Sequence, residues 1–149
     1  MYKRQAYTLA IHAATLLFGR QYEEAKDAVH RALEIEPDNV VASYTLAWIL
    51  GATGDGEGAV AAGDRLLEVT GAPPAFRAIH ALGLGCAGRR AEAEDILSDL
   101  EGLPPGDVTG DVWRCLAAIG AGRLDEGRDY FVEAMRRSCL LYTSPSPRD

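Results

Sequence analysis

The three histidines are the side chains best suited to acid–base or metal chemistry in this 149-residue sequence. His12 and His80 are two steps apart in an internal period of 34 residues. With about 10 Å between adjacent helices, such positions lie roughly 20 Å apart, too far to share a metal ion. His30 lies in the charged segment EEAKDAVHRALE. We therefore expect no metal site, with His12 and His80 half-buried as packing residues and His30 solvated.

The cysteines and the glycine-rich stretch predict no catalysis either. Cys86, Cys115 and Cys139 form no CxxC pair and have no histidine at ligand spacing, which argues against zinc and against a disulfide framework. The stretch GATGDGEG at 51–58 lacks the lysine of a phosphate-binding loop. It also lies where a turn of the repeat belongs. The sequence predicts that the chain is not an enzyme and needs no cofactor.

Charge and hydropathy exclude two classes of partner. The net charge is −7, and acidic pairs such as Glu23 and Glu24 alternate with lysine and arginine, as on a solvated helix face. A phosphate backbone requires a basic surface, so we expect no nucleic-acid binding by this segment. No run of apolar residues is long enough for a membrane span, so we expect no membrane insertion. Cysteines without disulfide partners favour a cytoplasmic location.

A repeat of 34 residues without gaps organises the chain. Small residues recur at one position of each unit: Ala13, Ala47, Ala81 and Cys115. A second series of small residues is Ala25, Ala59, Ala93 and Gly127. A glycine series is Gly54, Gly88 and Gly122, with Gly19 one residue early in the first unit.

Two helices of about 13 residues and two turns account for a unit of this length. Small residues let the two helices cross closely, and the glycine ends the first helix in a left-handed conformation. Asp38 and Asp107 are candidate N-caps. The expected helices are 6–18, 22–35, 40–53, 56–70, 74–87, 90–101, 108–121 and 124–137.

The first unit carries a family resemblance. The segment GRQYEEAKDAVHRALEIEPDN resembles the second helix of a tetratricopeptide repeat, with matching residues Tyr22, Ala25, Ala32, Leu33 and Pro37. The resemblance implies an all-α, right-handed α-solenoid of four helix-turn-helix repeats and eight helices. The chain departs from the family at its fourth position, where the usual Trp is replaced by Leu9, Ser43, Arg77 and Asp111.

In this family the first helix of each unit lines a concave groove. Here the groove-facing positions are mainly apolar or small, and Tyr44 and Trp48 lie one helical turn apart. Ala10, Ala14, Ala75, Ala78 and Ile119 belong to the same set. The candidate partner-binding residues are Tyr7, Leu17, Val41, Tyr44, Trp48, Leu82, Val112 and Leu116.

An apolar groove with aromatic residues suits a helix or an extended apolar peptide. Chaperone-binding members of the family clamp a C-terminal carboxylate with Lys, Arg and Asn, and none stands at the expected places, so we expect no carboxylate clamp. An alternative is that Trp48 and Trp113 are packing residues in a groove filled by flanking repeats.

The leading hypothesis is a non-catalytic scaffold that binds a partner protein or an effector domain of its own chain. The alternative is the regulatory repeat region of a bacterial transcriptional regulator, kinase or nucleotide cyclase. The two C-terminal units, from AFRAIHALGLGCAGRR onward, are similar to repeat arrays that follow such domains. A helical enzyme would need a converging set of ionisable residues, which the sequence does not show.

Both ends differ from the repeats between them. Residues 1–5 (MYKRQ) and 139–149 (CLLYTSPSPRD) match translations of the two strands of a sequencing adapter, so we expect them to be scars. The expected repeats within residues 6–138 are 6–39, 40–73, 74–107 and 108–138, with a disordered tail from 139. A fragment of a longer array would expose the apolar outer face of its last unit, at Phe131, Val132 and Met135.

Overall fold

The computed structural model of the chain describes residues 2–104 and 108–143. Within these ranges the chain forms eight α-helices joined by short turns, with no strand. The helices are α1 (Tyr2–Phe18), α2 (Tyr22–Ile35), α3 (Val40–Ala52), α4 (Gly56–Thr70), α5 (Pro74–Cys86), α6 (Arg90–Glu101), α7 (Val108–Ala121) and α8 (Leu124–Thr143).

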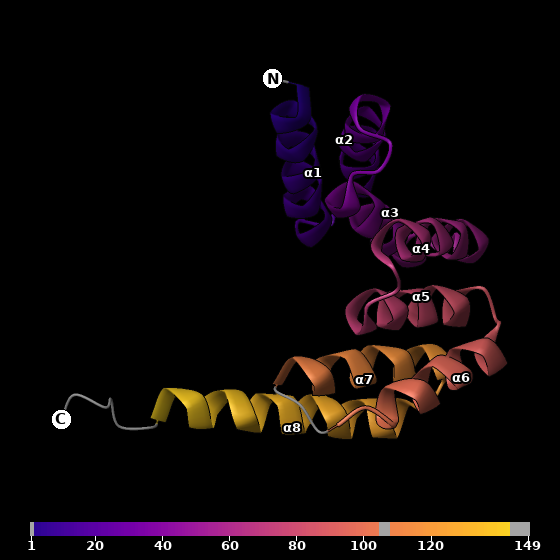
Figure 1. Cartoon of the computed structure of the whole chain (residues 1–149), viewed down its shortest axis with the longest axis vertical. Helices are drawn as coiled ribbons and strands as arrows, with labels where there is room; N and C mark the ends of the chain where they lie inside the picture. Colours follow the sequence, from indigo (N-terminus) through magenta and orange to yellow (C-terminus); the bar gives the residue numbers. More distant parts are fainter. Residues whose placement is uncertain (1, 105–107, 144–149) are drawn as a thin grey trace.

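Consecutive helices pair as hairpins, α1 with α2, α3 with α4, α5 with α6 and α7 with α8. The hairpins stack in chain order, and the helices change direction along the stack, from upright α1 and α2 to α7 and α8 lying across it (Figure 1). Each first helix contacts the second helix of its own unit, and α3, α5 and α7 also contact the second helix of the preceding unit. This arrangement confirms the predicted all-α solenoid of two-helix repeats.

The turn after each first helix has the same backbone hydrogen bonds in all four units. Asp55 N donates to Leu50 O, and Arg89 N donates to Leu84 O. The left-handed residue in three of these turns is the predicted glycine: Gly54 (φ 85°), Gly88 (φ 78°) and Gly122 (φ 82°). In the first unit the expectation for Gly19 is wrong, because Arg20 takes the left-handed conformation instead, with a φ of 57°.

The N-cap of α3 also differs from the expectation. Asn39, not Asp38, caps this helix, because the Asn39 side chain accepts a hydrogen bond of 3.0 Å from Ala42 N. Asp38 accepts a hydrogen bond of 3.1 Å from Arg65 Nη2 instead. The other predicted cap, Asp107, lies outside the described residues.

Small residues bring the first helices into backbone contact where α5 crosses α7. A β-carbon on Gly85 would lie 2.3 Å from Gly120 O, and one on Gly120 would lie 2.1 Å from Ala81 O. Neither distance leaves room for a side chain. Above and below this crossing, buried leucines and alanines fill the space between the layers. The most completely buried leucines are Leu66, Leu84, Leu97 and Leu100.

The two equivalent histidines have different surroundings. His80 is half-buried, as predicted, and packs against Gly63 of the preceding unit, with its Nε2 3.0 Å from Asp64 Oδ1. Burial lowers the pKa of His80, and Asp64 only partly opposes this shift. His12 is exposed, so the prediction of half-burial is wrong there. No described helix precedes α1, so nothing packs on it as α4 packs on α5. His30 is exposed, as predicted.

Both terminal helices extend beyond their expected ends. Helix α1 begins at Tyr2 and α8 continues to Thr143, so the expectation of disorder from residue 139 is wrong for the first part of the tail. Lys3, Arg4 and Gln5 in the first extension, and Leu140 and Leu141 in the second, are residue types that favour helix. Residues 144–149 lie outside the described chain. The adapter origin of both ends stays a prediction.

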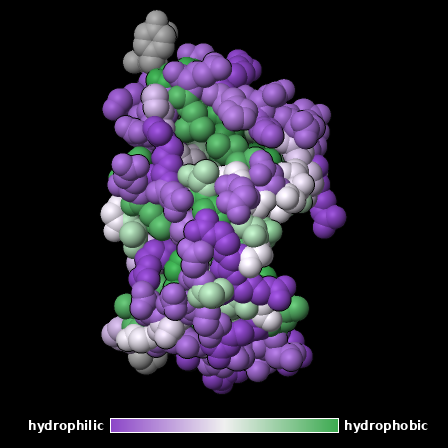
Figure 2. Space-filling view, turned by 90° about the vertical axis from the view of Figure 1, so that its right-hand side faces the viewer, coloured by the Kyte–Doolittle hydropathy of each residue, from purple (hydrophilic) through white to green (hydrophobic). Residues whose placement is uncertain are grey.

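The outer face of α8 is exposed, as expected from the sequence. Phe131 is 53%, Val132 57% and Met135 50% exposed. The charged faces of the second helices are solvated too, and both Glu23 and Glu24 are exposed. Figure 2, which views the molecule from the right of Figure 1, shows mostly hydrophilic residues with narrow apolar patches between them.

The close crossing of α5 and α7 predicts opposite effects for two glycines at the same repeat position. Gly85→Ala should destabilise the chain by about 1–3 kcal/mol, because the new methyl group would meet the backbone of Gly120. Gly51→Ala should be neutral or stabilising by up to about 1 kcal/mol, because its nearest neighbour would be Cys86 Sγ at 3.8 Å. Urea unfolding of both variants measures the difference. Equal effects would show that the backbones do not approach here.

The buried His80 predicts an acid-sensitive stability. Its folded-state pKa lies below the ordinary value of 6.5, so the unfolded chain binds the proton more readily. Stability should therefore fall as pH drops below about 6.5 toward the lowered folded-state pKa. Urea unfolding at pH 7.5 and 5.5 should show a smaller pH effect in His80→Gln than in the wild type. His12→Gln is the matched control and should behave like the wild type. A pH effect in His80→Gln as large as in the wild type would show that His80 does not cause the acid sensitivity.

Candidate partner-binding groove

The first helices form a continuous inner layer. Helix α1 contacts α3, α3 contacts α5 and α5 contacts α7, whereas α2, α4 and α6 make no such contacts with one another in the described chain. A stack whose members touch on one side and separate on the other curves toward the touching side. The first helices therefore lie on the inner side of the curve, which is the side where the groove is predicted.

The larger of two pockets on this face lies where α1 meets α3. Its volume is about 320 Å³, and its lining is almost entirely apolar and aromatic. Phe18, at the end of α1, is 84% exposed and stands at the mouth of the pocket. The lining residues are Ala14, Leu17, Phe18, Arg20, Tyr22, Tyr44, Trp48 and Ala52.

The second pocket lies one unit further along, where α3 meets α5. It is smaller, with a volume of about 160 Å³, and Trp48 forms part of its wall as well. The lining residues are Ala47, Trp48, Gly51, Ala52, Ile79, Leu82, Gly83 and Cys86. The indole of Trp48 therefore separates two neighbouring apolar hollows.

Three aromatic rings from two units meet in this part of the face. Tyr44 makes an edge-to-face contact with Trp48, with ring centroids 6.4 Å apart. A second such contact joins Tyr44 to Phe76 of α5, with centroids 6.1 Å apart. The Trp48 indole Nε1 is buried and has no hydrogen-bond partner in the described chain. These contacts fix the rings in one arrangement, as a preformed binding surface requires.

The structure brings half of the predicted site residues together. Leu17, Tyr44, Trp48 and Leu82 line the two pockets. Tyr7 is 55% exposed but lines neither pocket. Val41, Val112 and Leu116 are half-buried, Val41 and Leu116 against the core.

Ala10 and Ala78, which were expected to face the groove, are fully buried. They are small residues inside the close-packed helix layer, where the backbones leave no path to solvent. Ala14 does line the larger pocket, as expected.

Sequence reasoning missed the contributions of the turns and of the adjoining helix ends. Phe18, Arg20 and Tyr22 line the larger pocket from the α1–α2 turn, and the groove prediction considered only the bodies of first helices. Phe76 was missed because it lies in the first turn of α5, next to the predicted Ala75. The repeat gave no signal for it, because the residue one unit after Tyr44 is Ala78 and Phe76 is equivalent to Ala42.

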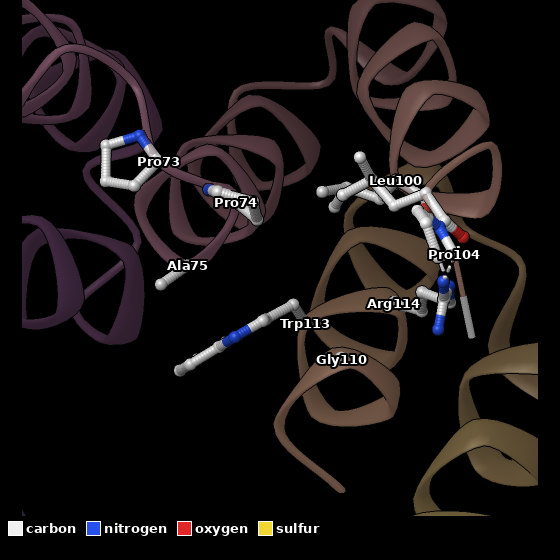
Figure 3. A pocket seen from close by; sticks show the side chains of 9 residues that line it. Pro73, Pro74, Ala75, Leu100, Pro104, Gly110, Trp113 and Arg114 are labelled. Atoms are coloured by element: carbon white, nitrogen blue, oxygen red, sulfur yellow. Dashed lines mark hydrogen bonds between the residues drawn. The ribbon is translucent and has the colours of Figure 1, made fainter. Parts of the chain in front are cut away.

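A third hollow of about 300 Å³ lies between the start of α5, the end of α6 and α7. Figure 3 shows the Trp113 side chain extending from α7 toward Ala75 and Pro73. Leu100, Pro104 and Arg114 close the opposite side.

A buried ion network is centred on Asp111, which occupies the position where the family usually has Trp. Arg114 Nη1 lies 3.3 Å from Asp111 Oδ1, and Arg137 Nη1 lies 3.1 Å from Asp111 Oδ2. Arg114 also donates to the carbonyl oxygens of Leu100 (3.1 Å) and Leu103 (3.0 Å) at the end of α6. The network ties α6, α7 and α8 together and has a structural role.

The groups with large pKa shifts lie away from the groove. Burial and a 2.6 Å hydrogen bond to Glu101 raise the pKa of Tyr130 to about 12. Hydrogen bonds from Arg136 and Arg137 lower the pKa of Glu133 to about 2. Within the described residues, no group of three or more His, Cys, Asp or Glu could hold a metal ion. None of the described helices is both long and apolar enough to cross a membrane.

Comparison with known proteins identifies similar sequences and folds. The family model described as tetratricopeptide repeat matches residues 19–82. No curated protein matches the chain. The similar solved structures include "Crystal structure of MamA", with 17% sequence identity and a TM-score of 0.63, covering 94% of this chain and 82% of that one.

Two further structures have the same fold. "MamA RS-1 ArsTM double mutant" has 12% identity and a TM-score of 0.59, covering 94% of this chain and 79% of its own. "MamA MSR-1 C2" has 18% identity and a TM-score of 0.55, covering 87% and 75% respectively.

The solenoid of two-helix repeats and the family match over residues 19–82 support a scaffold for protein–protein interaction. The same findings support a tetratricopeptide repeat protein.

The buried network predicts that Arg114 cannot be replaced by lysine. Arg114→Lys should destabilise the chain by about 2–4 kcal/mol, because three separate guanidinium nitrogens reach Asp111 and the two carbonyl oxygens, and the one nitrogen of lysine cannot lie close to all three. Arg128→Lys on the exposed face of α8 is the control, and should change stability by no more than about 0.5 kcal/mol. Urea unfolding measures both. A neutral Arg114→Lys would show that the network is dispensable.

Proposed function

We propose that the chain is a non-catalytic scaffold whose concave groove binds an apolar helix or an extended apolar peptide. The observation that carries the proposal is the position of Trp48, which forms a wall of both groove pockets and contacts Tyr44. Large aromatic side chains in the middle of a binding surface supply most of the energy in protein interfaces.

The shape of the groove supports a partner with two neighbouring apolar side chains. The pockets have volumes of about 320 and 160 Å³, which suit a large and a smaller side chain on either side of the Trp48 indole.

The polar content of the groove supports binding over catalysis. Apart from Arg20, Tyr22, Tyr44 and Trp48, the side chains that line the two pockets carry no hydrogen-bonding nitrogen or oxygen. Cys86 lines the smaller pocket and is a free thiol. The described free thiols, Cys86 and Cys115, suit a reducing cytoplasm. A clamp for a C-terminal carboxylate is not part of this proposal.

Trp48→Ala tests the proposal directly. Peptides of 16 residues would be selected on the wild-type chain from a random display library, and their dissociation constants measured by fluorescence anisotropy. Trp48→Ala should weaken binding at least about 30-fold, the loss expected for a central aromatic anchor.

Phe131→Ser is the matched control, because Phe131 is a large exposed apolar residue outside the groove. It should leave the affinity unchanged. Selected peptides that lose affinity with Phe131→Ser and not with Trp48→Ala would place the binding surface on α8 and contradict the proposal.

A further inference from the structure

Arg20 occupies a backbone position that glycine holds in the other three units. In its turn, Gln21 N donates to Leu16 O at 2.9 Å, as Asp55 N donates to Leu50 O at 2.9 Å in the next unit. The Arg20 backbone has a φ of 57°, which residues with a β-carbon rarely adopt because the β-carbon then crowds the backbone. The turn itself thus has no need of an arginine, because glycine forms it elsewhere.

The side chain of Arg20 has a place in the groove. Arg20 is exposed and lines the mouth of the larger pocket beside Phe18 and Tyr22. Among the residues that line the two groove pockets, it is the one with a formal charge. The chain as a whole has a net charge of −7, so the positive charge of Arg20 is opposite in sign to that of the whole chain.

Resting on the proposed function, we propose that the larger pocket selects a peptide in which a carboxylate side chain adjoins the bulky apolar anchor. The anchor enters between Leu17, Tyr44 and Trp48, and the carboxylate pairs with the Arg20 guanidinium at the mouth. The left-handed arginine is retained for this contact at a cost in stability. Phe18, which is 84% exposed, extends the apolar lining of the pocket beside Arg20.

Three fluorescein-labelled peptides with the sequence Gly-Ser-X-Leu-Trp-X-Gly-Ser test the proposal, where X is Asp, Asn or Lys. The wild-type chain should bind the Asp peptide about 5- to 10-fold more tightly than the Asn peptide, and the Lys peptide most weakly. The preference should shrink between 0.05 and 0.5 M NaCl, because salt screens a partly exposed ion pair.

Variants at Arg20 separate binding from structure. Arg20→Gly should abolish the preference for Asp and raise the melting temperature by about 2–4 °C, since it relieves the left-handed backbone. Arg20→Lys should keep the preference. Arg128→Gln, which removes a charge from α8, is the control and should change neither peptide selectivity nor affinity.

Each outcome decides between the two proposals. Equal binding of all three peptides by the wild type, with loss of affinity in Trp48→Ala, would overturn the role of Arg20 and leave the apolar groove intact. A preference for Asp that survives Arg20→Gly would also overturn it. Failure of all three peptides to bind the wild type would contradict both the inference and the groove itself.

Discussion

The close approach of the first helices is the constraint on which the rest of the structure depends. At the crossing of α5 and α7, the backbones of Gly85 and Gly120 leave no space for a methyl group. In the described chain the backbones of the second helices approach one another less closely than those of the first helices, so the stack curves toward the side of the first helices. Small residues thus set how closely α5 and α7 pack, and Ala81, whose carbonyl oxygen meets Gly120, belongs to a series of small residues repeated every 34 positions.

The concave face takes its chemistry from residues that project beyond this packed layer. Tyr44, Trp48 and Phe76 stand on the layer of small residues and hold one another in edge-to-face contacts. The turns contribute the remaining parts, Phe18 and Arg20. The close-packed layer therefore supplies rigidity, and the turn between α1 and α2 adds side chains that the other units do not have.

The sequence was sufficient to predict the fold because the repeat constrains every helix in the same way. Several details depended on neighbours that the repeat does not specify. His12 and His80 share a position, yet only His80 has a helix packed on it. Arg20 replaces glycine with no local signal, and Arg114 is buried because its network reaches α6 and α8. The central part of the groove was predictable, and the side chains from the turns were not.

The central claim is that partners bind on the layer of first helices. Paramagnetic broadening of the amide and indole NMR signals by a spin-labelled peptide selected on the wild-type chain tests it most directly. The account predicts the strongest broadening at the Trp48 indole N–H and along α1, α3 and α5. Broadening concentrated on α2, α4 and α6, with the Trp48 indole signal unaffected, would contradict it.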